Sequence, residues 1–167
     1  QLLRQAVAAQ PQNSEPYLAL ARVLSAQSRN DDALKTLSAA SAALPDNHDV
    51  ALYTAITQDN AGGFDAAREA YEQILTRWPT DMIAANNLAP LIADVWPTDR
   101  ARLDRARDLA ERFRDSPNPM LLDTLGWVLA RQGNYDDAAI LLRRSVSLAG
   151  DNRQIQYHYG VVLKAKG

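Results

Sequence analysis

The chain has 167 residues, of which 47% are apolar and 23% are charged, and its formal net charge at pH 7 is −2. A slightly acidic chain lacks the basic surface that nucleic acid or an anionic membrane attracts, so neither is expected as a partner. It has no cysteine, which excludes disulfides, thiolate zinc sites and a cysteine nucleophile. No apolar run approaches the roughly 18 residues of a transmembrane helix, so no segment is expected to insert into a membrane.

Prolines and small residues recur along the chain with a period of about 34 residues. Three series show this spacing: Pro11, Pro45 and Pro79; Ala21, Ala55 and Ala89; and Gly126 and Gly160. A second set of alanines follows the first at a shorter and mostly constant interval: Ala33, Ala67, Ala106 and Ala138. A fixed period with small residues at two offsets predicts pairs of antiparallel helices, packed closely where those small residues lie.

In chain order, residues 1–11 are predicted to be the second helix of a preceding repeat. Complete repeats are expected over 14–47, 48–81, 82–118 and 119–152, and the first helix of a following repeat over 153–167. The third repeat carries an insertion near 96–100, because the interval from Ala89 to Ala106 is longer than the matching interval in the other repeats. The chain opens in mid-helix, and we expect it to be a fragment of a longer array.

The phrase "LDTLGWVLARQGNYDDA" at 122–138 shows how one repeat is built. Its first helix has an apolar face at helical spacing, and its second helix has another after a turn at Gly133-Asn134. The residues concerned are Leu122, Leu125, Gly126 and Leu129, then Tyr135, Ala138 and Leu142.

Pro90 falls inside the predicted first helix of the third repeat. Since proline has no N–H, it frees the carbonyl of Asn86 and predicts a kink toward the groove. The second helix of that repeat, within 99–115, carries six arginines and five interleaved acids. It is interpreted as a solvent face with ion pairs such as Asp104–Arg107 and Glu111–Arg114.

Neither histidine indicates a reactive site. His48 lies in the turn "PDNHDV" and is expected to be solvated, and neither His48 nor His158 has a carboxylate or serine partner that suggests a nucleophile or a metal site. Catalysis needs titratable groups that converge in a cleft. We therefore expect no enzyme activity, no cofactor and no metal.

These features resemble the tetratricopeptide repeat (TPR) family over the whole chain. In the first complete repeat the matching residues are Tyr17, Leu20, Ala21, Leu24, Ala33, Leu37, Ala40 and Pro45. The resemblance implies an all-α fold, a right-handed α-solenoid of tandem antiparallel helix hairpins that forms the TPR superhelix. It also implies that the first helix of each repeat lines a concave groove, which binds a protein or peptide segment.

The candidate groove residues are those on first helices opposite the packing face. They are Arg22, Tyr53, Asn86, Asn87, Asp123, Trp127, Arg131, Tyr157 and His158. Asparagine carries both a donor and an acceptor for a peptide backbone, tryptophan is enriched in binding hot spots, and the two arginines suit acidic groups.

Each candidate also has a structural interpretation. Trp127 can pack against the neighbouring repeat, Asn86 and Asn87 can act as local caps, and Asp123 and Arg131 can be solvated. TPR proteins that hold chaperone C-termini use a clamp of lysine, arginine and asparagine. The matching positions here are Leu18, Arg22, Asn87, Met120 and Thr124, of which only Asn87 fits, so that activity is not expected.

A narrower resemblance links "NNLAPLIAD", "LLDTLGW" and "YHYGVVLKAKG" to bacterial TPR proteins of exopolysaccharide export and exosortase systems. It implies a larger bacterial assembly and slightly favours the periplasm, although the compartment stays unknown. The leading hypothesis is a non-enzymatic protein–protein interaction module. The alternatives are a scaffold that self-associates through open array ends, and a substrate-recruiting array of a larger enzyme.

Overall fold

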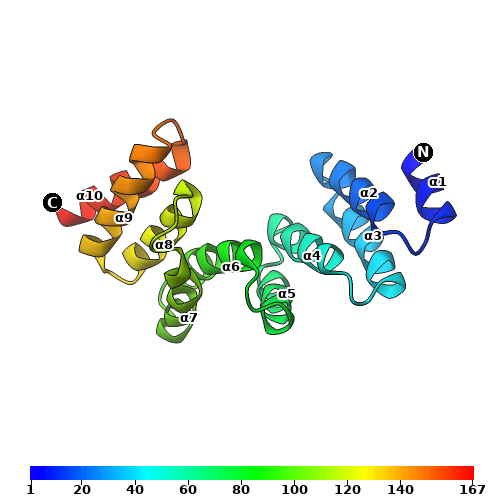
Figure 1. The fold of residues 1–167 in the computed structure, drawn as a ribbon, viewed down its shortest axis with the longest axis horizontal. Helices are drawn as coiled ribbons and strands as arrows, with labels where there is room; N and C mark the ends of the chain where they lie inside the picture. Colours follow the sequence, from blue (N-terminus) through cyan, green and yellow to red (C-terminus); the bar gives the residue numbers. More distant parts are fainter. The chain divides into compact units, whose positions relative to one another are not determined.

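The computed structural model describes all residues 1–167, which form ten α-helices, one short 3₁₀ helix and no strand (Figure 1). The elements are α1 (Leu2–Ala9), α2 (Ser14–Ala26), α3 (Asn30–Ala43), α4 (His48–Asn60), α5 (Phe64–Arg77), α6 (Met82–Val95), α7 (Arg100–Ala110), η1 (Glu111–Phe113), α8 (Pro119–Arg131), α9 (Tyr135–Leu148) and α10 (Arg153–Lys166). The predicted all-α fold of tandem helix hairpins is confirmed. The chain divides into two compact units, unit 1 (Gln1–Ala84) and unit 2 (Ala85–Gly167), which are described separately. No helix combines the length and the apolar character that crossing a membrane requires.

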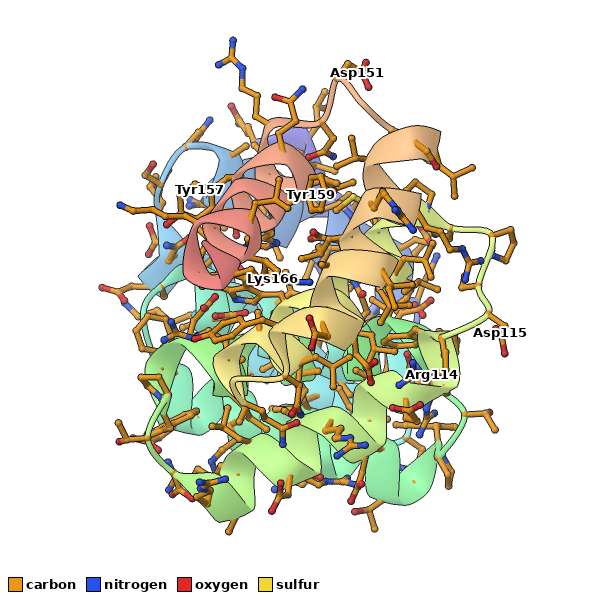
Figure 2. The ribbon with its side chains drawn as sticks, turned by 90° about the vertical axis from the view of Figure 1, so that its left-hand side faces the viewer. Arg114, Asp115, Asp151, Tyr157, Tyr159 and Lys166 are labelled. Atoms are coloured by element: carbon orange, nitrogen blue, oxygen red, sulfur yellow. The ribbon has the colours of Figure 1, made fainter.

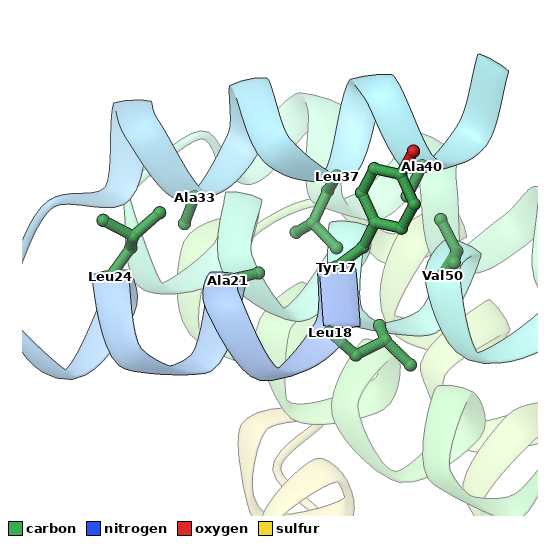
Figure 3. Packing of buried hydrophobic residues seen from close by; sticks show 8 residues of the cluster. All are labelled: Tyr17, Leu18, Ala21, Leu24, Ala33, Leu37, Ala40 and Val50. Atoms are coloured by element: carbon green, nitrogen blue, oxygen red, sulfur yellow. The ribbon is translucent and has the colours of Figure 1, made fainter. Parts of the chain in front are cut away.

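Unit 1 contains α1 and the hairpins α2–α3 and α4–α5. Its first core cluster lies between α2, α3 and the start of α4 (Figure 3), and its buried members are Tyr17, Leu18, Ala21, Leu24, Ala33, Leu37, Ala40 and Val50. Ala33 and Leu37 are fully buried. Each large apolar side chain buried in this way contributes roughly 1.5–3 kcal/mol, and the alanines let the two helix backbones approach closely.

Unit 2 contains most of α6, then α7, the hairpin α8–α9, and α10. Helices α8 and α9 pack tightly at Gly126 in α8, where a Cβ would lie only 2.7 Å from the Cγ of Leu142 in α9. Leu122, Leu125 and Leu142 are fully buried around this crossing. Glycine is therefore required at position 126 by the packing of α9.

Two kinds of connection alternate along the chain. Every first helix after α1 begins at an Asn or Asp side chain that accepts from the first-turn backbone: Asn13, Asn47, Asp81, Asn118 and Asn152. Such caps stabilise helix starts by about 1 kcal/mol each. The turn inside three of the hairpins instead uses one left-handed residue: Ser28, Gly62 and Gly133. In these three hairpins the geometry is thus encoded locally, at both ends of the first helix.

The third repeat departs from this regularity. Its first helix, α6, runs without a break through Pro90, and the predicted bend there stays a prediction. Glu111 pairs with Arg114 as expected. The predicted pair Asp104–Arg107 is wrong, because the Asp104 carboxylate accepts a hydrogen bond of 2.9 Å from Gln132 instead.

Candidate functional site

Polar side chains of α8 connect it to α6 inside unit 2. The Thr124 hydroxyl donates to Oδ1 of Asn86 at 2.7 Å, and the Trp127 indole Nε1 donates to Oδ1 of Asp94 at 2.8 Å. Residues three and four apart on a helix share one face, so Thr124, Trp127 and Arg131 together present a single edge of α8 to α6.

Arg131 makes the third connection, through a backbone group. Its Nε donates to the carbonyl oxygen of Ala93 at 3.0 Å. In a continuing helix that oxygen would accept from residue 97, but residue 97 is proline and has no N–H. The insertion that ends α6 therefore leaves a carbonyl without a helical partner, and Arg131 satisfies it.

The same edge of α8 also contacts α10. Nδ1 of His158 lies 2.9 and 3.0 Å from the two carboxylate oxygens of Asp123, so it donates to that carboxylate. The imidazole stacks on the Trp127 indole with centroids 4.1 Å apart. Tyr157 lies beside this pair, with its ring centroid 6.4 Å from that of Trp127. We call this set of residues from three first helices the α6–α8–α10 network: Asn86, Asp94, Asp123, Thr124, Trp127, Arg131, Tyr157 and His158.

Burial separates the network into an interior and a rim. Trp127, Asp123 and His158 are only 6%, 2% and 7% exposed, so most of their surface is already occupied by protein. Tyr157 is 64% exposed on α10 (Figure 2), and Arg131 is half-buried. Tyr157 and Arg131 therefore form an accessible rim around the buried side chains of the network.

These contacts change three of the sequence-based interpretations. Asp123 is not solvated, and His158 does have a carboxylate partner, contrary to expectation. Neither Asn86 nor Asn87 caps nearby backbone beside Pro90, because the Asn86 oxygen accepts from the Thr124 hydroxyl and the Asn87 amide makes no hydrogen bond within the chain. Trp127 packs against neighbouring helices, as its structural interpretation proposed.

Asn86 and Asn87 are neighbours with different roles. The Asn86 side-chain oxygen is engaged by Thr124. Asn87 is half-buried, and its amide makes no hydrogen bond within the chain. An amide without an internal partner offers one acceptor and two donors to a ligand.

Unit 1 contains the other two candidate residues, Arg22 on α2 and Tyr53 on α4. The Arg22 guanidinium lies 4.5 Å above the centre of the Tyr53 ring. Such a cation–π contact contributes about 0.5–1 kcal/mol when exposed. It holds an exposed cation and an aromatic face together on neighbouring first helices.

His48, the other histidine, is not simply solvated. Its Nε2 pairs with Asp81, its Nδ1 lies 3.1 Å from Asp49, and its ring meets Trp78 edge-on at 4.9 Å. The hydrogen bonds to Asp81 and Asp49 raise the pKa of His48 above its ordinary value. Burial pushes the pKa of Asp81 upward, but backbone N–H groups and His48 outweigh it and lower that pKa overall.

The side chains of these sites are connected by hydrogen bonds and ring contacts. No group of three His, Asp or Glu side chains is arranged to hold a metal ion. The network instead supplies a cation, an aromatic ring and an amide on one set of helices. Asp94 is the member that sequence reasoning missed. It precedes Trp127 by close to one repeat length, which is the only signal that pairs them.

Comparisons with known proteins identify this architecture. Tetratricopeptide repeat models match residues 1–58 and residues 52–91, 99–153 and 124–167. No curated protein sequence matches the chain significantly.

Solved TPR structures share the fold. TTC0263, a TPR protein from Thermus thermophilus, superimposes with a TM-score of 0.75 at 21% identity, covering 93% of this chain and 84% of that one. MamA from Desulfovibrio magneticus RS-1 gives 0.77 at 14% identity, covering 92% and 85%. YrrB, described as a TPR protein with an unusual peptide-binding site, gives 0.68 at 18% identity, covering 99% and 84%. The family models together span nearly the whole sequence, and the chain belongs to the tetratricopeptide repeat family.

Proposed function

We propose that this chain is a non-enzymatic interaction module that binds a peptide or protein segment on the first-helix surface of unit 2. TPR proteins are generally interaction modules, which supports the general class of function. The observation that carries the specific proposal is the free Asn87 amide on α6, a helix that the network joins to α8 and α10. The accessible rim of that network is formed by Arg131 and Tyr157.

These three side chains have complementary roles. The Asn87 amide pairs with the backbone of an extended segment whatever its sequence. Tyr157 offers an exposed ring with a polar end, and aromatic residues of this type are enriched in interfaces. The Nε of Arg131 is held by Ala93, which leaves its terminal nitrogens for an acidic group.

The α6–α8–α10 network supports binding by fixing this rim in advance. Trp127 bonds to Asp94 and stacks on His158, so α6, α8 and α10 are connected through one buried side chain. A surface that is already ordered loses less conformational entropy when a partner binds. The buried residues therefore act as positioning residues and the rim residues as contacts.

Unit 1 contributes a smaller candidate surface, the stacked Arg22 and Tyr53. We also propose that the chain acts within a larger bacterial assembly connected with exopolysaccharide export. This part of the proposal is supported only by the resemblance of three short sequence phrases. YrrB is itself described by a peptide-binding site, and this supports peptide binding as a role that the fold can carry.

Selection from a displayed peptide library tests the proposal. Peptides enriched on the wild-type chain are labelled, and their affinity is measured by fluorescence anisotropy for wild type and for a double variant, Asn87→Ala with Tyr157→Ala. The matched control is Ile140→Ala with Arg143→Ala, two exposed positions on α9. We expect the first variant to lose at least tenfold in affinity and the control to be unchanged.

Two results would contradict the proposal. Equal binding by all three proteins would show that the contact surface does not lie on the first helices of unit 2. Absence of any enriched peptide, together with dimers detected by light scattering, would favour the scaffold alternative. Circular dichroism on each variant separates loss of contact from loss of fold.

A further inference from the structure

Unit 2 contains a pocket of about 520 Å³ where the inserted loop, α7 and the α8–α9 turn meet. Its polar lining includes Thr98, Arg100, Asp104, Arg107, Arg131 and Gln132. Thr98 and Arg100 belong to the insertion near residues 96–100 that interrupts the repeat period. The pocket is therefore built by the segment that distinguishes the third repeat from the others.

The pocket has an excess of positive charge. It is lined by three arginines and one acid, although the chain as a whole carries a net charge of −2. That acid, Asp104, is engaged by the side-chain amide of Gln132 at 2.9 Å. A concave site lined by one sign of charge concentrates ligands of the opposite sign.

The arginines that line the pocket form no ion pairs with acidic side chains of the chain. Arg100 and Arg107 are exposed and make no ion pair within the chain, although Arg107 also lines a second hollow with Asp104, Asp108 and Glu111. Arg102, on the same helix, behaves differently: it lies 3.4 Å from Asp99 and stacks over Trp96 at 4.4 Å. Arg131 donates only its Nε internally, to Ala93. Arg100 and Arg107 thus line the pocket without an ion pair, Arg131 is held by Ala93 and lies over the Trp127 ring, and Arg102 lies outside the lining.

The spacing of these cations favours an extended ligand over a single ion. Arg100 and Arg107 are two helical turns apart, so they share one face of α7, separated by about 10 Å along its axis. Side chains on one face of an extended peptide are two or four positions apart, which separates them by about 7 or 13 Å and brackets this distance. The pocket volume also falls within the range of about 300–1,000 Å³ typical of sites that enclose a sizeable ligand.

We propose that this pocket binds the carboxylate side chains of an acidic peptide segment, through Arg100, Arg107 and Arg131. The inference rests on the proposed function and deepens it, because Arg131 belongs both to the pocket and to the rim of the α6–α8–α10 network. It assigns a chemistry to the partner: an acidic stretch that runs from the rim into the pocket. Guanidinium groups suit this role because their paired donors match a carboxylate.

Titration of the ¹⁵N-labelled chain with a hexaglutamate peptide, followed by amide chemical shifts, tests this assignment. We expect saturable shifts at Thr98 and around Gly133 to Tyr135, which weaken as salt is added. A double variant, Arg100→Gln with Arg107→Gln, is expected to raise the Kd about tenfold or more, since each charge-assisted contact is worth roughly a factor of ten. The control, Arg143→Gln with Arg153→Gln, removes the same charge from exposed positions elsewhere and is expected to bind as wild type does.

The outcomes separate this inference from the proposed function. Equal weakening in both double variants would show that only net charge matters and would overturn the pocket. Saturable binding of inorganic phosphate without binding of hexaglutamate would overturn the peptide assignment. In a third outcome, the double variant Asn87→Ala with Tyr157→Ala no longer binds the library-selected peptides, but the wild type does not bind hexaglutamate. This result would support the proposed function and contradict only the acidic-peptide pocket.

Discussion

The imidazole of His158 lies parallel to the indole of Trp127, with the ring planes 11° apart and the centroids separated by 4.1 Å. The stack joins α10 to α8, and the hydrogen bond from Trp127 to Asp94 extends the connection to α6. Asp123 completes it by accepting from Nδ1 of the imidazole. Three first helices are thus held by one continuous set of side-chain contacts.

Replacing His158 with alanine is expected to lower the free energy of unfolding. The decrease should be larger than the loss of side-chain packing alone would cause. The Asp123 carboxylate would remain buried without its donor, and an unsatisfied buried acceptor costs about 1–3 kcal/mol. Urea unfolding followed by circular dichroism measures the change. Tyr157→Ala, on the same helix but 64% exposed, serves as the control, with an expected change below about 1 kcal/mol. Equal losses in the two variants would mean that the Asp123 contact contributes nothing.

The stability of unit 1 is expected to depend on pH through His48. Hydrogen bonds to Asp81 and Asp49 raise its pKa, so the protonated form is favoured in the folded state. The resulting stabilisation is fully present below the unfolded-state pKa and is lost as pH rises through the folded-state pKa. Between about pH 6 and pH 8 the wild type should therefore lose stability relative to His48→Gln, which does not titrate there.

The expected effect is small, at most about 1 kcal/mol, because solvent screens a side chain that is 35% exposed. Urea midpoints at the two pH values, compared between the wild type and His48→Gln, isolate the contribution of His48. A stability difference between the two proteins that is independent of pH, or that grows as pH rises, would contradict this account of the Asp81 contact.

The fold was predictable from the sequence because its determinants are local and repeated. Ala21 and Ala55 lie at equivalent places in successive hairpins, and the regular spacing between them predicts helix pairs without reference to distant contacts. The alternation of apolar and polar residues along each helix then predicts which face packs against other helices and which face does not. This is sufficient for the all-α hairpin fold, which the family models and the solved relatives confirm.

The candidate site was less predictable because it depends on side-chain geometry between repeats. The period shows that α6 lies beside α8, but it does not show that Trp127 turns its N–H toward Asp94 or that His158 covers its face. Position alone placed Trp127 among the groove candidates and left packing against the neighbouring repeat as an alternative, and in the structure Trp127 is packed and only 6% exposed. The sequence also did not show that Arg100 and Arg107 lack ion pairs, because the spacing of charges along α7 predicted pairs such as Asp104–Arg107.

Gly126 and Gly160 occupy equivalent positions in successive repeats, yet alanine is expected to have opposite effects at the two positions. At Gly126 the new Cβ would lie 2.7 Å from Cγ of the fully buried Leu142, and overpacking of this kind costs about 1–3 kcal/mol. At Gly160 no atom lies within 4 Å of the new Cβ, so the higher helix propensity of alanine should stabilise α10 by about 0.5–1 kcal/mol. Urea unfolding of both variants checks this pair, and destabilisation by Gly160→Ala would show that its surroundings are filled.

Ser28 and Gly133 occupy the left-handed turn of their hairpins, at φ angles of 59° and 84°. A residue with a Cβ is strained there by roughly 1–2 kcal/mol, and glycine is not. Ser28→Gly should therefore stabilise the chain by up to about 1 kcal/mol, after allowance for the greater freedom of glycine in the unfolded state. Gly133→Ala should destabilise it by a similar amount, and because no atom lies within 4 Å of the added Cβ, the loss reports the backbone alone. Thermal and urea unfolding of both variants measure the two changes. A loss of stability in Ser28→Gly would mean that the serine side chain contributes more to the α2–α3 turn than the strain it imposes.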